Sequence, residues 1–289
     1  MFHRRRFRLR LPSRALLLGE RTLVMAVLNV TPDSFSDGGR FFDPDAAAAR
    51  ALALERAGAD IVDVGGESTR PGAEPVPADE ELARVLPVLE RLRGTLRVAI
   101  SIDTRKACIA EAAAAAGAEI LNDVSGLRAD PALAEVARRR RLPLVLMHMR
   151  GDPRTMQKQP FAREVLAEVR TGLRKAVARA LQAGVKRSQL ILDPGIGFGK
   201  SFRQNYELLA HLPKLAALGF PLLVGPSRKA FLGATLGTPE KPVPPEQRLW
   251  GTAATVAAAI LGGAHIVRVH DVAEMAQVAR VTDEILRAG

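Results

Sequence analysis

The feature that most constrains this chain is a regular alternation of short apolar runs with helix-forming stretches. Eight runs rich in aliphatic and β-branched residues are separated by stretches rich in Ala, Leu, Glu and Arg. Near-continuous apolar runs of this length are typical of parallel strands buried on both faces. Eight strand–helix units predict a single α/β domain with a (β/α)8 (TIM) barrel, because an open doubly wound sheet seldom has so many even units. The runs are Thr22–Val30, Asp60–Gly65, Arg97–Ile102, Glu119–Val124, Pro143–His148, Leu190–Asp193, Pro221–Gly225 and His265–Val269.

The length of the chain fits one barrel. A chain of 289 residues is an ordinary size for this fold, and no shift in composition divides it. We therefore expect one domain over residues 1–289, in which residues 1–21 form a basic N-terminal extension or a hairpin leading into the barrel. Four glycines follow helical stretches and suit the left-handed backbone of a helix end, namely Gly58, Gly117, Gly184 and Gly219.

Composition indicates the compartment. No apolar run reaches the length needed to cross a bilayer, and the N-terminus has a basic start without a long apolar core or a clear cleavage site. We expect a cytoplasmic protein with no membrane partner. The single cysteine, Cys108, excludes an intramolecular disulfide. Its Ala-rich surroundings favour a small buried packing residue over a nucleophile.

The net charge favours anionic ligands. A formal charge of +11 would also permit nonspecific binding of nucleic acid. However, the arginines cluster in residues 4–10 and 138–141, and no basic stripe is interleaved with aromatics as a single-strand groove requires. We expect no nucleic-acid partner. A noncatalytic anion or nucleic-acid binder remains an alternative, and it would show salt-sensitive DNA affinity without Mg²⁺-dependent turnover.

Polar clusters follow nearly every predicted strand. The carboxyl ends of barrel strands meet at one mouth, where active sites are built. Eight consecutive strands ending in this way predict a site, since ordinary polar loops would supply only one or two such residues. In chain order the clusters are Asn29 with Asp33 and Asp37, Asp63 with residues 66–72, residues 101–106, residues 122–126, residues 147–149, residues 193–200, residues 225–229 and residues 268–271.

The residue types at these ends suit one class of ligand. Asp103, Asn122 and Asp193 offer acceptors and an amide to a planar heterocycle with amino and ring N–H groups, because a buried unpaired donor costs about 1–3 kcal/mol. Lys229, Arg268 and His270 add positive charge, and an arginine can stack on a ring or grip a phosphate. The predicted ligand is a flat amino-bearing heterocycle that carries a phosphate or diphosphate.

Asn29 is the candidate metal ligand. With Asp33 or Asp37 close in sequence, it offers hard oxygen ligands suited to Mg²⁺, which usually keeps waters and binds substrate phosphates. Two other motifs are weaker indications of a ligand site. Residues 195–201 resemble a P-loop, but Pro194 stands where the spacing requires Gly, so we do not expect ATP there. His148 has no second His or Cys at ligand spacing, and we expect a hydrogen-bonded residue near the mouth.

These motifs together resemble the dihydropteroate synthases. The resemblance runs from about residue 22 to 288, in the same order on every strand, and the first two motifs are highly specific. It implies condensation of 6-hydroxymethyl-7,8-dihydropterin diphosphate with p-aminobenzoate, a step of folate biosynthesis and the target of sulfonamides. It also implies a homodimer. The motifs are Asn29–Gly39, Gly66–Gly72, Asp193–Lys200, Ser227–Lys229 and Arg268–Asp271.

The resemblance also implies residue roles. The pterin-binding set is Asp103, Asn122, Asp193 and Lys229, with Met147, Gly197 and Phe198 alongside. Arg268 would pack on the pterin and hold the diphosphate, and the anion site would further contain His270, Thr69 and, through Mg²⁺, Asn29. The p-aminobenzoate pocket would contain Phe35, Arg70, Pro71 and Ser227. The catalytic set is Asp103, Lys229, Arg268, Asp33 and Arg70.

One rival enzyme class stays open. Pterin-binding methyltransferase barrels resemble this fold and its pterin pocket but move a methyl group to a corrinoid partner. Such an enzyme would not need the Asn29–Gly39 segment, Arg70 or Lys229.

Overall fold

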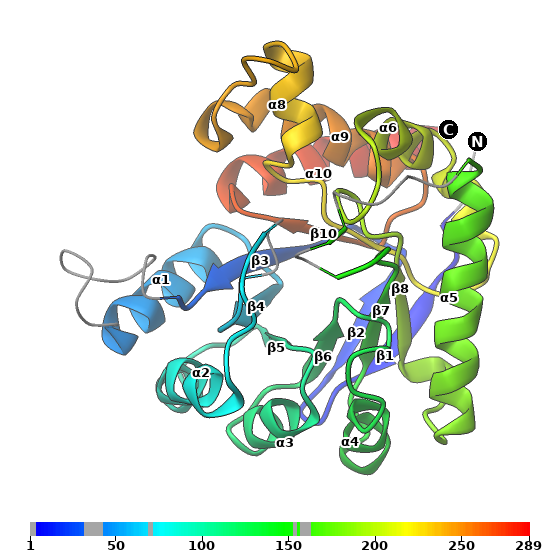
Figure 1. The fold of residues 1–289 in the computed structure, drawn as a ribbon. Coiled ribbons are helices and arrows are strands. Elements are labelled where there is room, and N and C mark those ends of the chain that lie inside the picture. Colours follow the sequence, from blue (N-terminus) through cyan, green and yellow to red (C-terminus); the bar gives the residue numbers. More distant parts are fainter. Residues whose placement is uncertain (1–3, 32–42, 69–71, 153–154, 157–162) are drawn as a thin grey trace.

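The computed structural model describes residues 4–31, 43–68, 72–152, 155–156 and 163–289. Eight parallel strands form one sheet in the spatial order β8-β7-β6-β5-β4-β3-β10-β9. A parallel bridge between Leu192 and Leu222 joins the two ends of this sheet, and helices surround the strands (Figure 1). The (β/α)8 barrel predicted from the sequence is confirmed, and the open doubly wound sheet is excluded.

The observed strands lie within the predicted runs, except that β5 extends one residue further, to Asp103. The barrel strands are β3 (Leu23–Asn29), β4 (Ile61–Gly65), β5 (Ala99–Asp103), β6 (Ile120–Asp123), β7 (Leu144–Met147), β8 (Leu190–Asp193), β9 (Leu223–Val224) and β10 (Ile266–Val269).

The helices alternate with the strands, with two helices in the unit after β8 and two in the unit after β9. They are α1 (Pro44–Arg56), α2 (Ala78–Leu92), α3 (Ala107–Ala115), α4 (Leu133–Arg140), α5 (Val165–Gln182), α6 (Phe202–Ala210), α7 (Leu212–Ala216), α8 (Ala230–Leu236), α9 (Leu249–Leu261) and α10 (Val272–Ala288), with short 3₁₀ turns η2 (Arg187–Gln189) and η3 (Pro245–Gln247). None of the described helices is long and apolar enough to cross a membrane.

Local sequence signals set several helix ends. Asp43 caps α1 by accepting hydrogen bonds from the backbone N–H groups of Asp45 and Ala46, and Pro44 starts the helix. The glycines predicted to end helical stretches all have positive φ: +105° at Gly58, +113° at Gly117, +83° at Gly184 and +78° at Gly219.

The prediction for Cys108 is wrong, because its side chain is exposed. Helix α3 buries Ile109, Ala110 and Ala113 against the barrel. Residue 108 precedes the buried Ile109 by one position, which is a rotation of about 100° around a helix of 3.6 residues per turn. Because the remaining residues of this Ala-rich helix are nearly all alike in size and polarity, the sequence gives little indication of which face is buried.

The strand residues divide the core into two parts. One set of alternate residues, which includes Val24, Ala26 and Leu28 on β3, points outward and packs against the surrounding helices. The other set points into the barrel and forms a separate apolar cluster with Met25 and Ile61 at its centre. This inner cluster occupies only the N-terminal part of the barrel, so the C-terminal part is free for other side chains.

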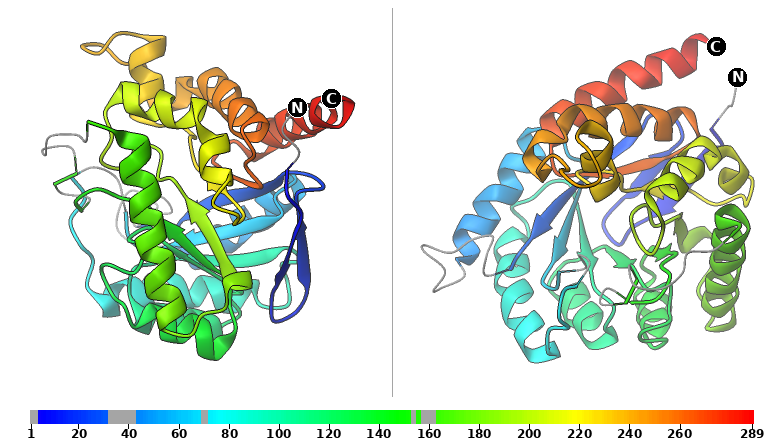
Figure 2. Two further views of the ribbon diagram at one scale, coloured as in Figure 1. Left: turned by 90° about the vertical axis from the view of Figure 1, so that its right-hand side faces the viewer. Right: turned by 45° about the horizontal axis from the view of Figure 1, so that its top comes forward.

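An antiparallel hairpin precedes the barrel. Strands β1 (Phe7–Arg10) and β2 (Ala15–Leu18) pair in register, and Leu9, Leu11 and Leu18 pack into the inner apolar cluster. The hairpin therefore closes the N-terminal end of the barrel, where it is dark blue in the left view of Figure 2. Of the two forms considered for residues 1–21, the described part is a hairpin.

Candidate active site at the barrel mouth

The inward face of the strands changes from apolar to polar along the barrel axis. The inner apolar cluster contains Ile61, Ala99, Ile120, Val145, Ile191 and Ile266. Two positions further along these six strands, on the same inward face, the residues are polar except for Met147; they are Asp63, Ser101, Asn122, Met147, Asp193 and Arg268. The strand register places Gly65 beside both Asn29 and Asp103 in the next inward layer. A ring of polar side chains thus lies at the mouth.

Arg268 and Asp63 together tie four strands to one another within this ring. Its Nε donates to Asp63 Oδ2 at 2.7 Å and its Nη2 donates to Asp103 Oδ2 at 2.8 Å. The same Asp63 oxygen accepts a hydrogen bond of 2.9 Å from Asn122 Nδ2. Asp63 is fully buried. Three of the sequence-predicted residues, Asp103, Asn122 and Arg268, therefore share one network centred on Asp63.

The two carboxylates of the predicted pterin set have perturbed acidities. Burial raises the pKa of Asp103 to about 7, while Arg268 acts to lower it and the Asp63 charge acts to raise it. Burial also raises the pKa of Asp193 to about 6, against the backbone N–H of Gly195 and the charge of Lys229. Asp193 Oδ1 accepts that N–H at 2.7 Å. The Asp193 charge in turn acts on Arg268, so the two carboxylates belong to one electrostatic site.

Lys229 reaches the site from the turn after β9. Its Nζ lies 4.0 Å from the centroid of the Phe198 ring, which is the geometry of a cation–π contact. Gly197 has φ +86°, and a Cβ at this position would lie 2.8 Å from Lys229 Cδ. The glycine therefore permits the close approach of the lysine side chain. This places Lys229, Gly197 and Phe198 together beside Asp193.

A strained turn aims the side chains of the 227–229 motif. Arg228 has φ +57°, which is uncommon for a residue other than glycine. Its guanidinium makes a two-point ion pair with Asp271, with Nε 3.0 Å from Oδ2, and its backbone N–H donates to Thr252 Oγ1 at 3.1 Å. These contacts hold the turn in place, with Ser227 beside His270 and Lys229 over the Phe198 ring.

Ser227 and His270 form a pair beside this turn. The Ser227 hydroxyl lies 3.0 Å from His270 Nδ1, and the backbone N–H of His270 donates to Ser227 Oγ at 3.2 Å. Burial lowers the pKa of His270 to about 3, and the charges of Arg268 and Arg228 add to this effect. The imidazole is therefore neutral near pH 7, with one ring nitrogen carrying a proton.

Two further predicted residues lie at the mouth. Asn29 ends β3, opposite Gly65 in the register, and is half-buried. Its amide oxygen is a hard donor that fits Mg²⁺. Among the described residues no group of three His, Cys, Asp or Glu side chains could hold a metal ion, so an ion here would depend on other oxygens. Met147 is buried in a small cluster with Val124 and Phe198.

The remaining predicted residues lie outside the described parts of the chain. They are Asp33, Phe35, Thr69, Arg70 and Pro71, together with Asp37. The structure does describe the base of the segment before Thr69. Lys106 Nζ binds Glu67 at 2.6 Å and the buried Glu81 at 2.5 Å, and it also donates to the Val76 carbonyl at 2.7 Å.

Sequence reasoning left two residues without a role that the geometry places in or beside the site. Asp63 was noted at its strand end, but its position as the common acceptor of Arg268 and Asn122 was missed. The signal was available, because Asp63 is two residues from Ile61 on the inward face of a buried strand. Lys200 is the other, and its ammonium nitrogen lies 3.1 Å from His148 Nδ1. This contact fulfils the expectation of a hydrogen-bonded His148.

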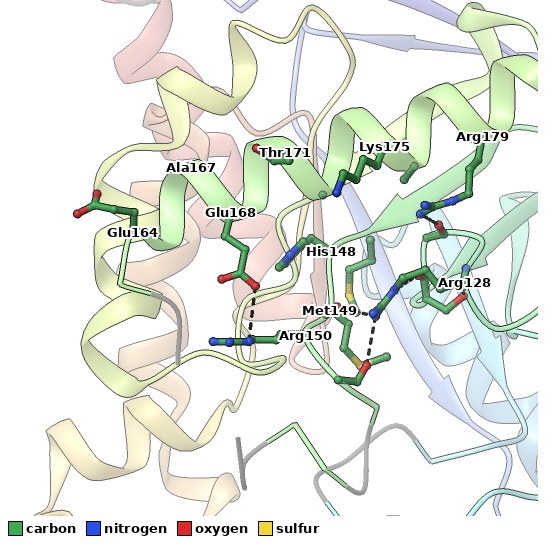
Figure 3. A pocket seen from close by; sticks show the side chains of 16 residues that line it. Arg128, His148, Met149, Arg150, Glu164, Ala167, Glu168, Thr171, Lys175 and Arg179 are labelled. Atoms are coloured by element: carbon green, nitrogen blue, oxygen red, sulfur yellow. Dashed lines mark hydrogen bonds and ion pairs between the residues drawn. The ribbon is translucent and has the colours of Figure 1, made fainter. Parts of the chain in front are cut away.

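A separate cavity of about 530 Å³ lies outside the barrel, between α5 and the loops after β6 and β7. Figure 3 shows His148 pointing toward α5 and Arg150 facing Glu168 across the cavity. Of the sequence-predicted site residues that the structure describes, only Met147 lines it. Because Asp103, Asn122, Asp193 and Arg268 are not among its lining residues, the candidate site is the barrel mouth and not this cavity.

Comparison with known proteins gives consistent results. Residues 25–270 match the family model described as pterin binding enzyme. A dihydropteroate synthase from Synechocystis is 49% identical over 269 residues, which cover 93% of this chain and 92% of the relative. A Yersinia pestis dihydropteroate synthase, solved with a sulfonamide drug, has a TM-score of 0.90 at 42% identity and covers 98% of this chain and 100% of that one. A Xanthomonas albilineans dihydropteroate synthase with 4-aminobenzoic acid has a TM-score of 0.89 at 44% identity, covering 98% and 99%.

Proposed function

Because this chain belongs to the pterin-binding enzymes, and among them to the dihydropteroate synthases, we infer that it condenses 6-hydroxymethyl-7,8-dihydropterin diphosphate with p-aminobenzoate. The products are 7,8-dihydropteroate and diphosphate, so the chain is a transferase of folate biosynthesis. The observation that carries this conclusion is the inward polar ring at the barrel mouth, in which Arg268 binds two carboxylates and Asn122 shares one of them.

The ring suits a pterin because its acceptors are buried and preorganised. A pterin presents an exocyclic amino group and ring N–H groups, and each would cost about 1–3 kcal/mol if buried unpaired. Asp103, Asn122 and Asp193 are all buried and offer oxygens to these donors. We propose that Lys229, placed over the Phe198 ring, binds the pterin beside them, with Gly197 and Met147 completing this side of the pocket.

The positive side chains suit the departing diphosphate. When the bond between the pterin methylene carbon and the diphosphate oxygen breaks, negative charge grows on the leaving group and positive charge grows on the methylene. We propose that Arg268 stabilises the leaving group, and that neutral His270 donates a hydrogen bond to it. The aryl amine of p-aminobenzoate then forms the new C–N bond and loses a proton. No covalent enzyme intermediate is needed.

Mg²⁺ is proposed as the cofactor, held by Asn29. The support is that Asn29 lies in the uppermost inward layer, where its amide oxygen is a hard donor. When bound, the ion would supply further charge stabilisation to the diphosphate. The remaining coordination positions would go to substrate phosphates and water, with Asp33 as a candidate contributor.

The p-aminobenzoate pocket is proposed to contain Ser227, Phe35, Arg70 and Pro71, and Thr69 is proposed for the anion site. Of these five residues only Ser227 is described, and it is fixed against His270. The relative from Xanthomonas albilineans solved with 4-aminobenzoic acid supports the substrate.

The test is diphosphate release from the pterin substrate and Mg²⁺, measured with and without p-aminobenzoate. We expect release that depends on p-aminobenzoate, with 7,8-dihydropteroate as the product detected by mass spectrometry. Methyl transfer from a methylated pterin to a corrinoid acceptor, with no diphosphate release, would identify the chain as a methyltransferase barrel instead.

We also propose a homodimer, and we propose that the protein is cytoplasmic. Support for the dimer comes from large exposed apolar side chains on the neighbouring helices α9 and α10. Trp250 is 78% exposed, Val281 63% and Ile285 50%. Light scattering should give the mass of two chains, and Trp250→Glu should shift the mass toward one chain.

A further inference from the structure

The glycine-rich stretch that resembles a P-loop ends in a buried lysine. Lys200 is only 2% exposed, whereas a P-loop lysine points outward to a phosphate. Its Nζ instead donates to the Phe198 carbonyl at 2.9 Å and to the His148 carbonyl at 3.1 Å, and it lies 3.1 Å from His148 Nδ1. The ammonium thus joins the segment after β8 to the end of β7.

We propose that Lys200 is a positioning residue for the pterin site, holding Phe198 and Gly197 where they fix Lys229. This inference rests on the function proposed above. It extends that function to a buried side chain that bonds to His148 and to the Phe198 carbonyl and is not among the residues proposed to bind the pterin.

The contacts of Lys229 explain why the position of this segment matters. Its ammonium lies over the Phe198 ring at 4.0 Å, and its Cδ approaches Gly197 so closely that a Cβ would lie 2.8 Å away. Both contacts come from residues within three positions of Lys200. A segment released by loss of the Lys200 hydrogen bonds would therefore move the surface against which Lys229 packs.

The position of His148, the partner of Lys200, is equally constrained. His148 lies against α5 at Gly172, where a Cβ would lie only 2.4 Å from His148 Cδ2. Glycine costs helix stability in the middle of α5, so its presence there is explained by the space that the ring needs. Burial lowers the pKa of His148 to about 2, so the imidazole is neutral, and its Nδ1 can accept a hydrogen bond from the Lys200 ammonium. The ring is thus held between Lys200 and α5, at the edge of the cavity in Figure 3.

Within the described residues, no ion pair explains the burial of Lys200 in another way. The partners of its ammonium there are two backbone carbonyls and a ring nitrogen, and no carboxylate lies within salt-bridge distance. Burial lowers the pKa of Lys200 to about 7, although Asp193 and Glu168 act to raise it from further away. A methionine would fill the same space more favourably if packing were the only role.

The test is the kinetics of Lys200→Met with both substrates. We expect KM for the pterin diphosphate to rise about three- to thirty-fold, the range of a lost cation–π contact, with KM for p-aminobenzoate unchanged. Phe198→Leu should give the same selective rise in KM for the pterin. The double variant should show no further rise, because both changes disrupt the same packing of Lys229 against residue 198. Val256→Ala, in the outer core on α9, is the control for lost stability alone.

A second variant covers the case in which Lys200→Met does not fold. Gly172→Ala improves helix propensity but pushes His148 toward Lys200, and it should raise the same KM. An unchanged KM for the pterin in either variant, an equal rise for both substrates, or additive effects in the double variant would overturn the proposal.

Direct binding separates this inference from the proposed function. Calorimetric titration with the pterin alone should show weaker binding to Lys200→Met than to the wild type. A wild type that binds the pterin but releases no diphosphate refutes the proposed reaction and leaves this comparison of affinities valid. A wild type that binds no pterin overturns both proposals.

Discussion

Replacing Asp63 by Asn tests the network at the mouth most sharply. Asp63 Oδ2 accepts from Arg268 at 2.7 Å and from Asn122 at 2.9 Å, and the side chain has no exposed surface. Asparagine keeps the shape and one oxygen but removes the charge that pairs with Arg268. A hydrogen bond to a charged group contributes about 1.5–3 kcal/mol and a neutral one about 0.5–1.5 kcal/mol. Since Asp103 remains as a partner of Arg268, we expect the free energy of unfolding to fall by about 2 kcal/mol, which lowers Tm by roughly 4–6 °C.

The same substitution should change the pH dependence of catalysis. Burial raises the pKa of Asp103 to about 7, and the Asp63 charge adds to that rise. Removing the charge should therefore lower the pKa of Asp103. If pterin binding needs ionised Asp103, the acid limb of kcat/KM for the pterin lies near pH 7 in the wild type and moves to lower pH in Asp63→Asn.

The assay is diphosphate release measured from pH 5 to 9, alongside thermal unfolding. Ser101→Ala is the matched control, because Ser101 lies in the same inward layer and its hydroxyl has no hydrogen-bond partner among the described residues. This control should leave both Tm and the acid limb nearly unchanged. An acid limb in Asp63→Asn that stays in place or moves to higher pH would refute the role given to the Asp63 charge.

Three further outcomes follow from the same geometry. Lys229→Ala and Asp193→Ala should abolish turnover with an unchanged circular-dichroism spectrum, and loss of the spectrum in either variant would contradict their placement at strand ends. Gly197→Ala should raise KM for the pterin and lower Tm, because the position has φ +86° and a Cβ would meet Lys229; wild-type values would count against the close approach. Lys200 has its pKa lowered to about 7 by burial, so the unfolded chain keeps this proton to higher pH than the folded one. The contribution of Lys200 to stability should therefore rise from about pH 7 to pH 10, and Tm of Lys200→Met should lack that rise.

The barrel itself was predictable because its signals are local and repeated. Every barrel strand falls in an apolar run apart from the last residue of β5, and Gly58, Gly117, Gly184 and Gly219 end helical stretches with the predicted left-handed backbone. The inward direction of Asp103, Asn122, Asp193 and Arg268 follows from the period of two along each strand. The strands, the helix ends and the inward-facing residues could be predicted without knowledge of contacts between distant segments.

What could not be predicted depends on such contacts. The shared acceptor at Asp63 requires strands β4, β6 and β10 to be in register, and no single strand shows this. The buried position of Lys200 depends on the carbonyl of His148, the residue that follows β7. Cys108 was wrongly predicted as buried because α3 is mostly alanine, and only the position of Ile109 decides which face packs.

The central claim is that side chains from separate strands hold one flat molecule at the barrel mouth. Crystals of this protein soaked with the pterin test it directly. We predict density for the ring within hydrogen-bond distance of Asp103, Asn122 and Asp193, with Lys229 and Arg268 in contact with the ligand. Pterin density in the cavity beside α5, or anywhere else with the mouth empty, would contradict the account.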